Sequence, residues 1–325
     1  MMSLVENVRL APQRTMRSLL ISLSQRRSLA RLAVRSPLTR PVVARFVAGE
    51  TLDLALPAIA ALKRAGLHTT VDVLGESVTS PELATTAVDR YVATIAALSE
   101  GGLDPNVSLK LTQMGLAIGR DFCQANVMRI VEAVRGVNGF VRFDMEDHTQ
   151  TDATLEVWRV AQDAYPQVGV VIQSALRRSS ADVDSIIAVG GRIRLCKGAY
   201  DEPGSVAYRT KAAVDANYAR LMERLLLADV YPALATHDPK LIAKATEIVE
   251  SRGIGRDRFE FQMLYGVRRD LQRALLDRGY TVRIYVPYGQ EWYPYFMRRL
   301  AERPANVGFM LRAIVKEEGR RIRAK

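Results

Sequence analysis

Residues 193–200 read IRLCKGAY and bring two cations and a phenol to the end of an apolar run. Arg194 and Lys197 lie three positions apart, and Tyr200 follows a glycine and an alanine. Because a buried charge without a partner costs several kcal/mol, such cations indicate bound anions or paired carboxylates. The glycine and alanine leave room for a ligand close to the backbone. The segment therefore suits a phosphate-bearing cofactor, although Lys-Gly-Ala alone is not specific for one.

Charged side chains recur in other short apolar runs. Lys110 lies in VSLKL and Asp144 lies in FVRFDM, as Arg194 lies in RIRLCK. If these runs are parallel strands of one sheet, their charges converge on one mouth, where they could hold a charged substrate. Other polar candidates at or near strand ends are Glu76, Glu146, Gln173, Thr236, His237, Gln262 and Tyr285.

The elements that would position these residues alternate from residue 69 onward. Short runs rich in β-branched residues are followed by segments of helical periodicity. We expect strands at 69–74, 107–111, 140–145, 168–173, 192–197, 231–236, 259–264 and 281–286. We expect helices at 49–66, 81–100, 121–135, 151–164, 205–228, 238–251 and 267–278.

Eight strands, each followed by a helix, predict an α/β fold of the (β/α)8 type, a TIM-like barrel. An open doubly wound sheet is the alternative, but it normally has fewer strands, and no G-x-G-x-x-G opens a helix after the first one. Within this fold we expect an N-terminal helical arm over 1–68, a catalytic barrel over 69–310 and a basic tail over 311–325.

Composition narrows the function further. The chain is 48% hydrophobic and 25% charged, which is typical of globular proteins. Cys123 and Cys196 are too few for a disulfide framework, and the three histidines lack metal-ligand spacing. A serine hydrolase is disfavoured because no G-x-S-x-G elbow is present. No run approaches the ~18–20 apolar residues that a membrane-spanning helix needs.

The positive charge lies at the two ends of the chain. The net charge is +11, and residues 1–50 carry nine arginines against two glutamates. Residues 311–325 carry six basic residues against two glutamates, which leaves the body between the ends neutral. This distribution disfavours a nucleic-acid groove across the body and suits solvated helix faces or contact with an anionic lipid surface. The Arg- and Ser-rich start also has the composition of a transit peptide, although we favour amphipathic helices that stay on the protein.

The segment EWYPYFMRRLAERP follows the last expected strand. If it is helical over about 291–303, Tyr295, Arg298 and Glu302 fall on one face. Arg298 and Arg299 could then form a fork for a carboxylate. A pair of arginines on a C-terminal helix is more often exposed to solvent, so this pattern alone does not identify a site.

Seven sequence blocks together resemble the proline dehydrogenase family in order and spacing across roughly 40–310. They are LGE (74–76), SLKL (108–111), RFDME (142–146), RLCKGAY (194–200), LATHD (234–238), FQMLYG (261–266) and IYVPYG with WYPYFMRRL (284–300). The chain has no long extension and so is similar to the monofunctional bacterial type. It departs from the family pattern in Asp201-Glu202-Pro203 after KGAY and in Asp238 after the histidine.

The resemblance implies a distorted (β/α)8 barrel that binds FAD, with the last helix over the barrel mouth. It implies oxidation of L-proline to Δ1-pyrroline-5-carboxylate by hydride transfer from C5 of proline to flavin N5, the first step of proline catabolism to glutamate. Electrons would then pass to a quinone.

The resemblance also implies roles for individual residues. Lys110, Arg298 and Arg299 would bind the proline carboxylate, and Tyr200, Leu264 and Tyr285 would pack around the ring. Asp144 and Arg194 would be catalytic, with Asp144 orienting the charged groups and Arg194 reaching flavin N5. Glu76 would pair with Arg298 as a gate. The other cofactor contacts would be Met145, Gln173, Cys196, Lys197, Gly198, Ala199, Thr236, His237 and Glu302.

We expect the chain to act in the cytoplasm, with peripheral contact on anionic lipid at the inner face of the membrane. A Δ1-pyrroline-5-carboxylate dehydrogenase is an expected partner and nucleic acid is not. Two other functions stay open at this point: a phosphate-binding barrel aldolase or isomerase that uses a lysine, and a non-enzymatic membrane-surface binder.

Overall fold

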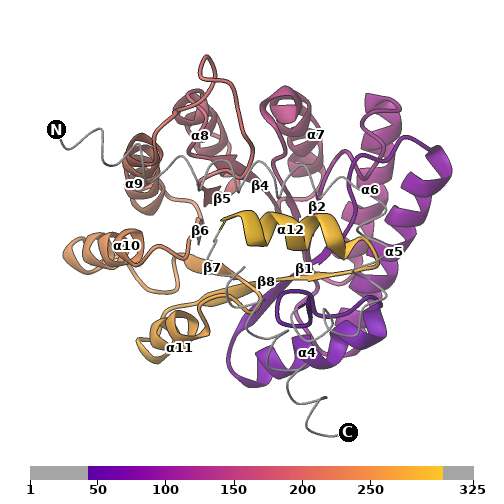
Figure 1. Cartoon of the computed structure of the whole chain (residues 1–325), viewed down its shortest axis with the longest axis horizontal. Coiled ribbons are helices and arrows are strands. Elements are labelled where there is room, and N and C mark those ends of the chain that lie inside the picture. The colour runs from indigo at the N-terminus through magenta and orange to yellow at the C-terminus, as the bar shows by residue number, and fades with distance from the viewer. Residues whose placement is uncertain (1–42, 303–325) are drawn as a thin grey trace, which may run out of the picture. The chain divides into compact units, whose positions relative to one another are not determined.

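A computed structural model describes residues 43–302 of the chain, and Figure 1 shows the arrangement of its elements. Most of the expected N-terminal arm and the whole basic tail lie outside the described residues, so the proposed division of the chain stays a prediction. The chain forms two compact units. One comprises residues 56–286, and the other comprises the described residues up to Ala55 together with those from Pro287 onward.

Eight parallel strands close into a barrel in sequence order, β1 to β8. This topology confirms the predicted TIM-like barrel and excludes the open doubly wound sheet. The strands are β1 His68–Val73, β2 Asn106–Leu109, β3 Phe140–Phe143, β4 Val168–Gln173, β5 Arg192–Cys196, β6 Ala233–Ala235, β7 Glu260–Leu264 and β8 Val282–Tyr288. Each expected strand is found, and β6 is shorter than its sequence run because only three residues pair.

Helices follow the strands and surround the barrel (Figure 1). They are α5 Pro81–Glu100, α6 Arg120–Gly136, α7 Thr151–Ala164, α8 Ser179–Ile187, α9 Lys211–Leu227, α10 Pro239–Ser251 and α11 Arg269–Asp277. α4 Leu52–Arg64 precedes β1, a 3-10 turn η1 His148–Gln150 precedes α7, and α12 Trp292–Glu302 ends the described chain. α8 was not among the expected helices, and α9 begins later than expected because residues 201–210 form an extended loop.

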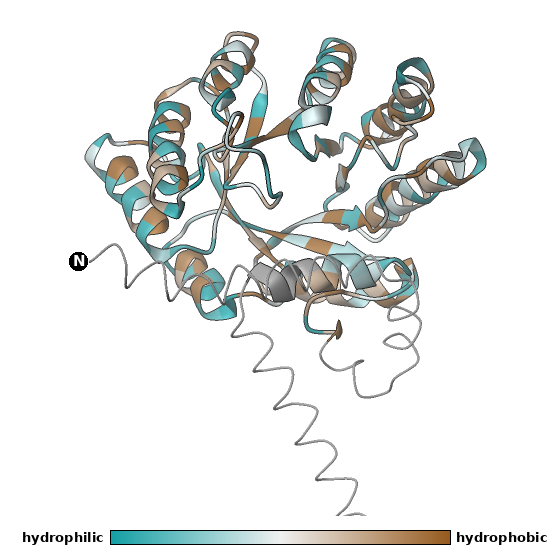
Figure 2. Cartoon of the chain, turned by 45° about the horizontal axis from the view of Figure 1, so that its top comes forward, coloured by the Kyte–Doolittle hydropathy of each residue, from teal (hydrophilic) through white to brown (hydrophobic). Residues whose placement is uncertain are grey.

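Helix starts follow the capping chemistry of their sequences. The side chains of Ser80, Thr210 and Asp238 accept backbone N–H groups in the first turns of α5, α9 and α10. Pro81 and Pro239 occupy the first helical position, where no N–H donor is needed. Helices α5 to α11 each bury apolar residues, and the helices around the barrel carry both hydrophobic and hydrophilic turns (Figure 2).

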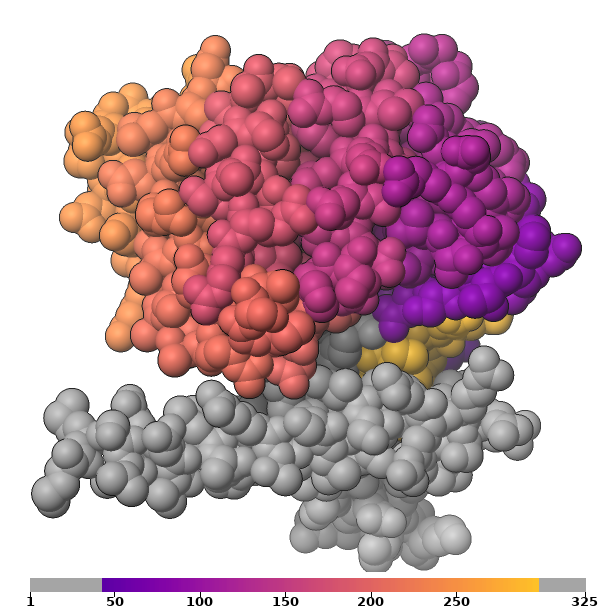
Figure 3. Space-filling model, turned by 90° about the horizontal axis from the view of Figure 1, so that it is seen from above, coloured from indigo at the N-terminus to yellow at the C-terminus, as the bar shows by residue number. Residues whose placement is uncertain are grey.

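The barrel wall is tightly packed. Val107, Val141, Val170, Ile193 and Phe261 are wholly buried strand residues. In the space-filling view the residues coloured magenta through orange form a continuous surface (Figure 3). None of the helices in the described part of the chain is long and apolar enough to cross a bilayer.

The residues of the second unit, including the last residues of β8, contact one another. Ala48 N–H donates to the Pro287 carbonyl, and Gly289 N–H donates to the Gly49 carbonyl, both at 2.9 Å. The indole of Trp292 donates to Glu50 at 3.2 Å. The expected C-terminal helix is thus present as α12, and its start is tied to residues 48–50.

Candidate active site

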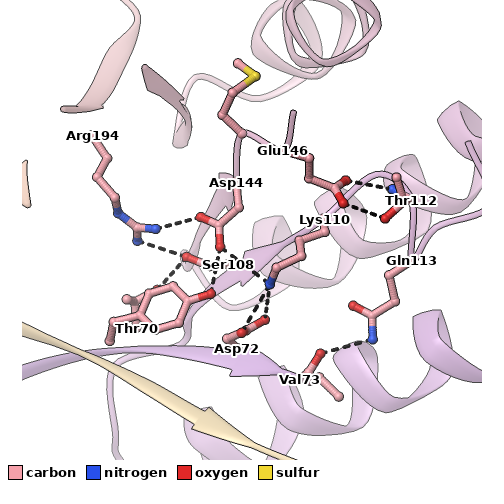
Figure 4. Close-up of polar contacts among 12 residues, drawn as sticks. Thr70, Asp72, Val73, Ser108, Lys110, Thr112, Gln113, Asp144, Glu146 and Arg194 are labelled. Carbon is pink, nitrogen blue, oxygen red and sulfur yellow. Dashed lines mark hydrogen bonds and ion pairs between the residues drawn. The ribbon is translucent and has the colours of Figure 1, made fainter. Parts of the chain in front are cut away.

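The centre of the site is a buried cluster of charges at the C-terminal ends of β1, β2 and β3 (Figure 4). Lys110 directly follows β2, and its Nζ lies 3.2 Å from both carboxylate oxygens of Asp72 and 3.9 Å from Asp144. Asp72 is fully buried, and 13% of the Lys110 side chain is exposed. Two carboxylates therefore hold one ammonium group in a fixed position.

This pairing fixes the charge of Lys110. Burial alone would lower the pKa of Lys110, but Asp72 and Asp144 raise it above its usual value. Burial raises the pKa of Asp72, and the attraction of Lys110 opposes this rise. An ammonium group held in this way can bind an anion but cannot easily serve as a neutral amine.

Asp144 joins this cluster to a second cation. It lies just past β3, and its Oδ1 accepts a hydrogen bond from Arg194 Nη1 at 2.6 Å. The hydroxyl of Tyr285 donates to Asp144 Oδ2 at 2.7 Å. Burial and the adjacent Asp144 raise the pKa of Tyr285 well above its usual value, so this hydroxyl keeps its proton. Asp144 is thus shared by Lys110, Arg194 and Tyr285.

Arg194 is held by residues from three other strands as well. Its Nη2 donates to Ser108 Oγ at 2.9 Å, its Nε donates to Gln262 Oε1, and its guanidinium carbon lies 5.2 Å from the centre of the Tyr285 ring. Ser108 in turn contacts Thr70 Oγ1 at 3.3 Å. Arg194 is 5% exposed and lies in the middle of β5 instead of at its end, so it projects into the barrel interior.

A cradle for a bound group lies beside β4 and β5. Gln173, the last residue of β4, donates from Nε2 to the backbone carbonyls of Met145 and Glu146 at 3.3 and 2.6 Å. Its Oε1 is buried and has no hydrogen-bond partner among residues 43–302. Gly198 has φ +104°, and a Cβ there would lie 2.8 Å from that oxygen. A buried acceptor next to an obligatory glycine suits a ligand that presents a donor close to the backbone.

Lys197 lies at the start of the loop that follows β5. Its Nζ lies 2.6 Å from Asp215 and 2.9 Å from Asp238. Asp238 also accepts the Lys240 N–H as the N-cap of α10. This aspartate, which departs from the family pattern, therefore positions Lys197 and begins the helix after β6.

Glu202, the other departure that makes specific contacts, is also structural. It is 7% exposed and accepts the backbone N–H of His148 at 2.9 Å as well as a bond with the His148 ring. The β5–α9 loop, which carries Tyr200, is thereby tied to the segment after β3, which carries Asp144. His148 thereby helps to hold the β5–α9 loop in place.

The remaining predicted residues lie at the ends of strands, in the loops after them, or on α12. Leu264 ends β7, and its N–H donates to His237 Nε2 at 2.9 Å. Residues placed at the carboxyl ends of strands or in the loops after them are Glu76, Met145, Cys196, Ala199, Tyr200 and Thr236. Arg298, Arg299 and Glu302 lie on α12, as predicted, but their side chains are outside the described part of the structure. Their contacts and the gate between Glu76 and Arg298 therefore stay predictions.

Asp72 and Ser108 were not predicted from the sequence. Asp72 sits inside the strand run TTVDVL, so it carried the same signal that identified Lys110: a charge among β-branched residues. Ser108 gives no such signal, because a serine in a strand is common.

Comparison with known proteins decides the family. The model for proline dehydrogenase matches residues 55–312. The chain belongs to the proline dehydrogenase family. It is 45% identical to the proline dehydrogenase of Deinococcus radiodurans, over 84% of this chain and 89% of that protein. It is 38% identical to proline dehydrogenase 2 of Bacillus subtilis, over 86% of this chain and 92% of that protein.

A solved structure supports the fold. The chain superposes on a proline utilization A (PutA) crystal structure from Bdellovibrio bacteriovorus with a TM-score of 0.76 and 27% identity. The match covers 81% of this chain and 32% of the other, so the chain spans about a third of that protein. Coverage of nearly the whole Deinococcus and Bacillus proteins agrees with the predicted likeness to the bacterial monofunctional type.

These findings confirm the predicted activity. The chain is an oxidoreductase that converts proline to Δ1-pyrroline-5-carboxylate, the first step of proline catabolism, and its family is flavin-dependent. The aldolase alternative, which could use Lys110 or Lys197, fails on the family, and for Lys110 also on the site. Schiff-base formation needs a neutral lysine, whereas Lys110 is held as a cation by Asp72 and Asp144.

Proposed function

We propose that the cofactor is FAD and that it lies at the C-terminal ends of β3 to β6. When bound, FAD would supply the two-electron acceptor for the hydride that leaves C5 of L-proline. Asp144 carries this proposal, because it connects the cation suited to the substrate, Lys110, with the cation suited to the flavin, Arg194.

The residues present fit such a cofactor. The unpartnered Gln173 oxygen and the open backbone at Gly198 form the cradle described above. The other residues that would hold the cofactor are Met145, Cys196, Lys197, Ala199, Thr236, His237 and Glu302. Arg194 would present a permanent positive charge to the redox-active ring, which favours electron density arriving there.

Lys110 would bind the carboxylate of proline together with Arg298 and Arg299. Three cations around one carboxylate fix the orientation of the substrate, and orientation supplies a large part of the rate enhancement of such reactions. Tyr200, Leu264 and Tyr285 would form the walls of the ring pocket. The ring nitrogen must be unprotonated for its lone pair to assist hydride departure. Asp144 would orient Lys110 and Arg194, and Tyr285 would keep its proton.

The proposed partners follow from the redox chemistry and from the charge distribution. A quinone would accept the electrons, and a Δ1-pyrroline-5-carboxylate dehydrogenase would consume the product. The nine arginines in residues 1–50 and the basic residues after 311 would bring the chain to anionic lipid at the cytoplasmic face of the membrane. The lipid contact is tested by sedimenting the full-length chain with anionic vesicles, next to a full-length variant in which arginines of residues 1–50 are glutamine. Equal binding of both proteins would remove it.

The cofactor and the substrate are tested in one titration. The purified chain should show a flavin absorption band that bleaches when L-proline is added without oxygen. D-Proline is a matched control with the same charges and ring. A Lys110→Met variant should need much more L-proline for the same bleaching while keeping its flavin. A chain that binds no flavin, or a flavin that L-proline leaves oxidised, would contradict the proposal.

A further inference from the structure

Arg194 is connected to the interior of the barrel through a pair of residues on β7. Gln262 Oε1 accepts the Arg194 Nε–H, and Gln262 Nε2 donates to Glu260 Oε1 at 2.5 Å. Glu260 and Gln262 lie two positions apart on one strand, so both project into the barrel. They are 2% and 4% exposed.

Glu260 is itself held by Arg283, a residue of the neighbouring strand β8. Arg283 Nε lies 3.1 and 3.0 Å from its two carboxylate oxygens, and Arg283 Nη1 donates to the Thr69 carbonyl at 2.8 Å. Burial alone would raise the pKa of Glu260, but Arg283, the Gln262 amide and Arg142 bring it below its usual value. Glu260 is therefore an ionised carboxylate that can only accept hydrogen bonds.

These contacts permit only one orientation of the Gln262 amide. A guanidinium only donates and a carboxylate only accepts, whereas an amide has one face of each kind. With its oxygen toward Arg194 and its nitrogen toward Glu260, both bonds form. A flipped amide would place donors against the guanidinium and an oxygen against the carboxylate, so both contacts would become repulsive.

The neutral amide also has an electrostatic consequence. Arg194 is already paired with Asp144 at 2.6 Å, and a second carboxylate in contact would cancel its field. Gln262 passes on the orientation imposed by Glu260 without bringing that negative charge into contact with Arg194. The remaining bond, from Arg194 Nη2 to Ser108, is to a neutral hydroxyl as well (Figure 4).

We propose that Glu260 and Gln262 are positioning residues that set the orientation of Arg194 and preserve its positive charge for the reaction. The orienting role stands on the contacts above, and its effect on the reaction rests on the proposed place of Arg194 beside the flavin. Gln262 combines two functions that a carboxylate at this position could not: it accepts from Arg194 Nε, and it adds no second negative charge beside that of Asp144.

The test compares three variants with a matched control. Gln262→Met removes the acceptor, and Glu260→Gln removes the group that orients the amide. The double variant Glu260→Gln with Gln262→Glu exchanges the two side chains, so it keeps an acceptor for Arg194 Nε but brings the negative charge into contact with Arg194. The control is Asn126→Leu on α6, because Asn126 is 5% exposed and donates, within the described part of the chain, only to the Met114 carbonyl at 3.0 Å. It loses a buried amide of similar burial without touching Arg194.

The first measurement uses the flavin-free protein. The Nε–H signal of Arg194 in proton–nitrogen NMR spectra, assigned from its absence in Arg194→Lys, should exchange slowly with solvent in the parent chain and in Asn126→Leu. It should exchange at least about tenfold faster in Gln262→Met and in Glu260→Gln, since the bond or its orientation is lost. Unchanged exchange in both β7 variants would overturn the orienting role, whether or not the chain binds flavin.

The second measurement uses the flavin-loaded protein. Gln262→Met should lower kcat about tenfold and leave KM for proline within about twofold, because Lys110 is held by other residues. The double variant Glu260→Gln with Gln262→Glu should make the flavin midpoint potential more negative than in the parent chain. Equal kcat losses in Gln262→Met and Asn126→Leu, with no change of potential in the double variant, would show that the pair is merely structural. Because the double variant keeps the shapes of both side chains, it decides the matter if Gln262→Met fails to fold.

Discussion

Replacing Asp72 with asparagine should make anion binding by Lys110 depend on pH. The substitution keeps the shape of the side chain and one acceptor but removes the negative charge 3.2 Å from Lys110 Nζ. Asp144, at 3.9 Å, then remains as the nearest carboxylate. Since burial lowers the pKa of Lys110 and Asp72 is the main group that raises it, the pKa should fall toward the assay range.

The size of the effect follows from the geometry. Two unit charges 3.2 Å apart attract each other by about 5 kcal/mol at an effective dielectric constant of about 20. Removing one partner of a buried pair costs about 3–5 kcal/mol of stability, and the asparagine oxygen should keep the loss near about 3 kcal/mol. A lysine whose pKa is raised on folding contributes stability below its unfolded pKa of about 10.4 and loses it as pH rises through the folded value. The parent chain should therefore keep its Lys110 charge throughout the assay, whereas the variant should lose it as pH rises.

The assay measures the dissociation constant of a five-membered ring carboxylate that has oxygen in place of the proline nitrogen. This ligand does not titrate between about pH 6 and about pH 9.5, so any dependence belongs to the protein. The parent chain should bind it with a nearly constant affinity, and Asp72→Asn should bind it at least about tenfold more weakly at the upper limit than at the lower one. A double variant, Asp72→Asn with Lys110→Arg, should show no slope, because arginine stays charged. Parallel profiles for the parent chain and Asp72→Asn would refute the reasoning.

Three further predictions concern neighbouring groups. Tyr285→Phe removes a 2.7 Å hydrogen bond to Asp144, and a hydrogen bond to a charged group is worth about 1.5–3 kcal/mol. The value of kcat/KM should therefore fall at least about tenfold with the flavin still bound. Unaltered kinetics would contradict this. Gly198→Ala forces a Cβ to within 2.8 Å of Gln173 Oε1 at φ +104°, which costs at least about 1–2 kcal/mol. Fluorescence titration of the flavin-free chain with FAD should therefore show at least about fivefold weaker binding. The control Gly190→Ala, at a positive φ but with open space around the Cβ, should bind FAD normally. The pKa of Glu260 is lowered on folding, so its stabilising effect is present above the unfolded pKa of about 4.3 and is lost as pH falls. In urea unfolding, the parent chain should lose more stability between about pH 6 and about pH 4 than Glu260→Gln does. Equal losses in the two proteins would contradict this prediction.

The barrel was predictable because its signals are local and repeated. Each strand lies in a short, mostly apolar run, and several of these runs are rich in β-branched residues. Each expected helix after residue 80 shows its own start signal or apolar face. α8 was missed because Ser179–Ile187 is short and begins with two serines and an alanine, which read as loop. The late start of α9 was missed because some of residues 205–210 are also common in helices. In the structure they belong to the loop of residues 201–210, which the hydrogen bond between Glu202 and the His148 N–H holds in place. Such a long-range contact has no signature in the segment itself.

The charged residues of the site could be predicted from the sequence, but most of their partners could not. Charged residues inside apolar runs marked Lys110, Asp144 and Arg194, since burial of a charge demands a partner wherever the fold places it. The partners themselves depend on which strands are neighbours and on how far each side chain projects. Gln262 illustrates this limit: the sequence shows a polar residue in β7, but only the positions of Arg194 and Glu260 reveal that its amide has a single permitted orientation.

The buried charges also explain why the barrel interior is polar along so much of its length. Lys110 and Arg194 near the mouth share Asp144, and Arg194 is linked through Gln262 to Glu260, which Arg283 neutralises. Because each cation is positioned by an acceptor on a different strand, displacement of one strand would disturb both the substrate side and the cofactor side of the site. An apolar filling of the same volume would often stabilise the fold equally well. The polar interior is therefore better explained by the need to hold two cations in fixed places beside one carboxylate than by stability alone.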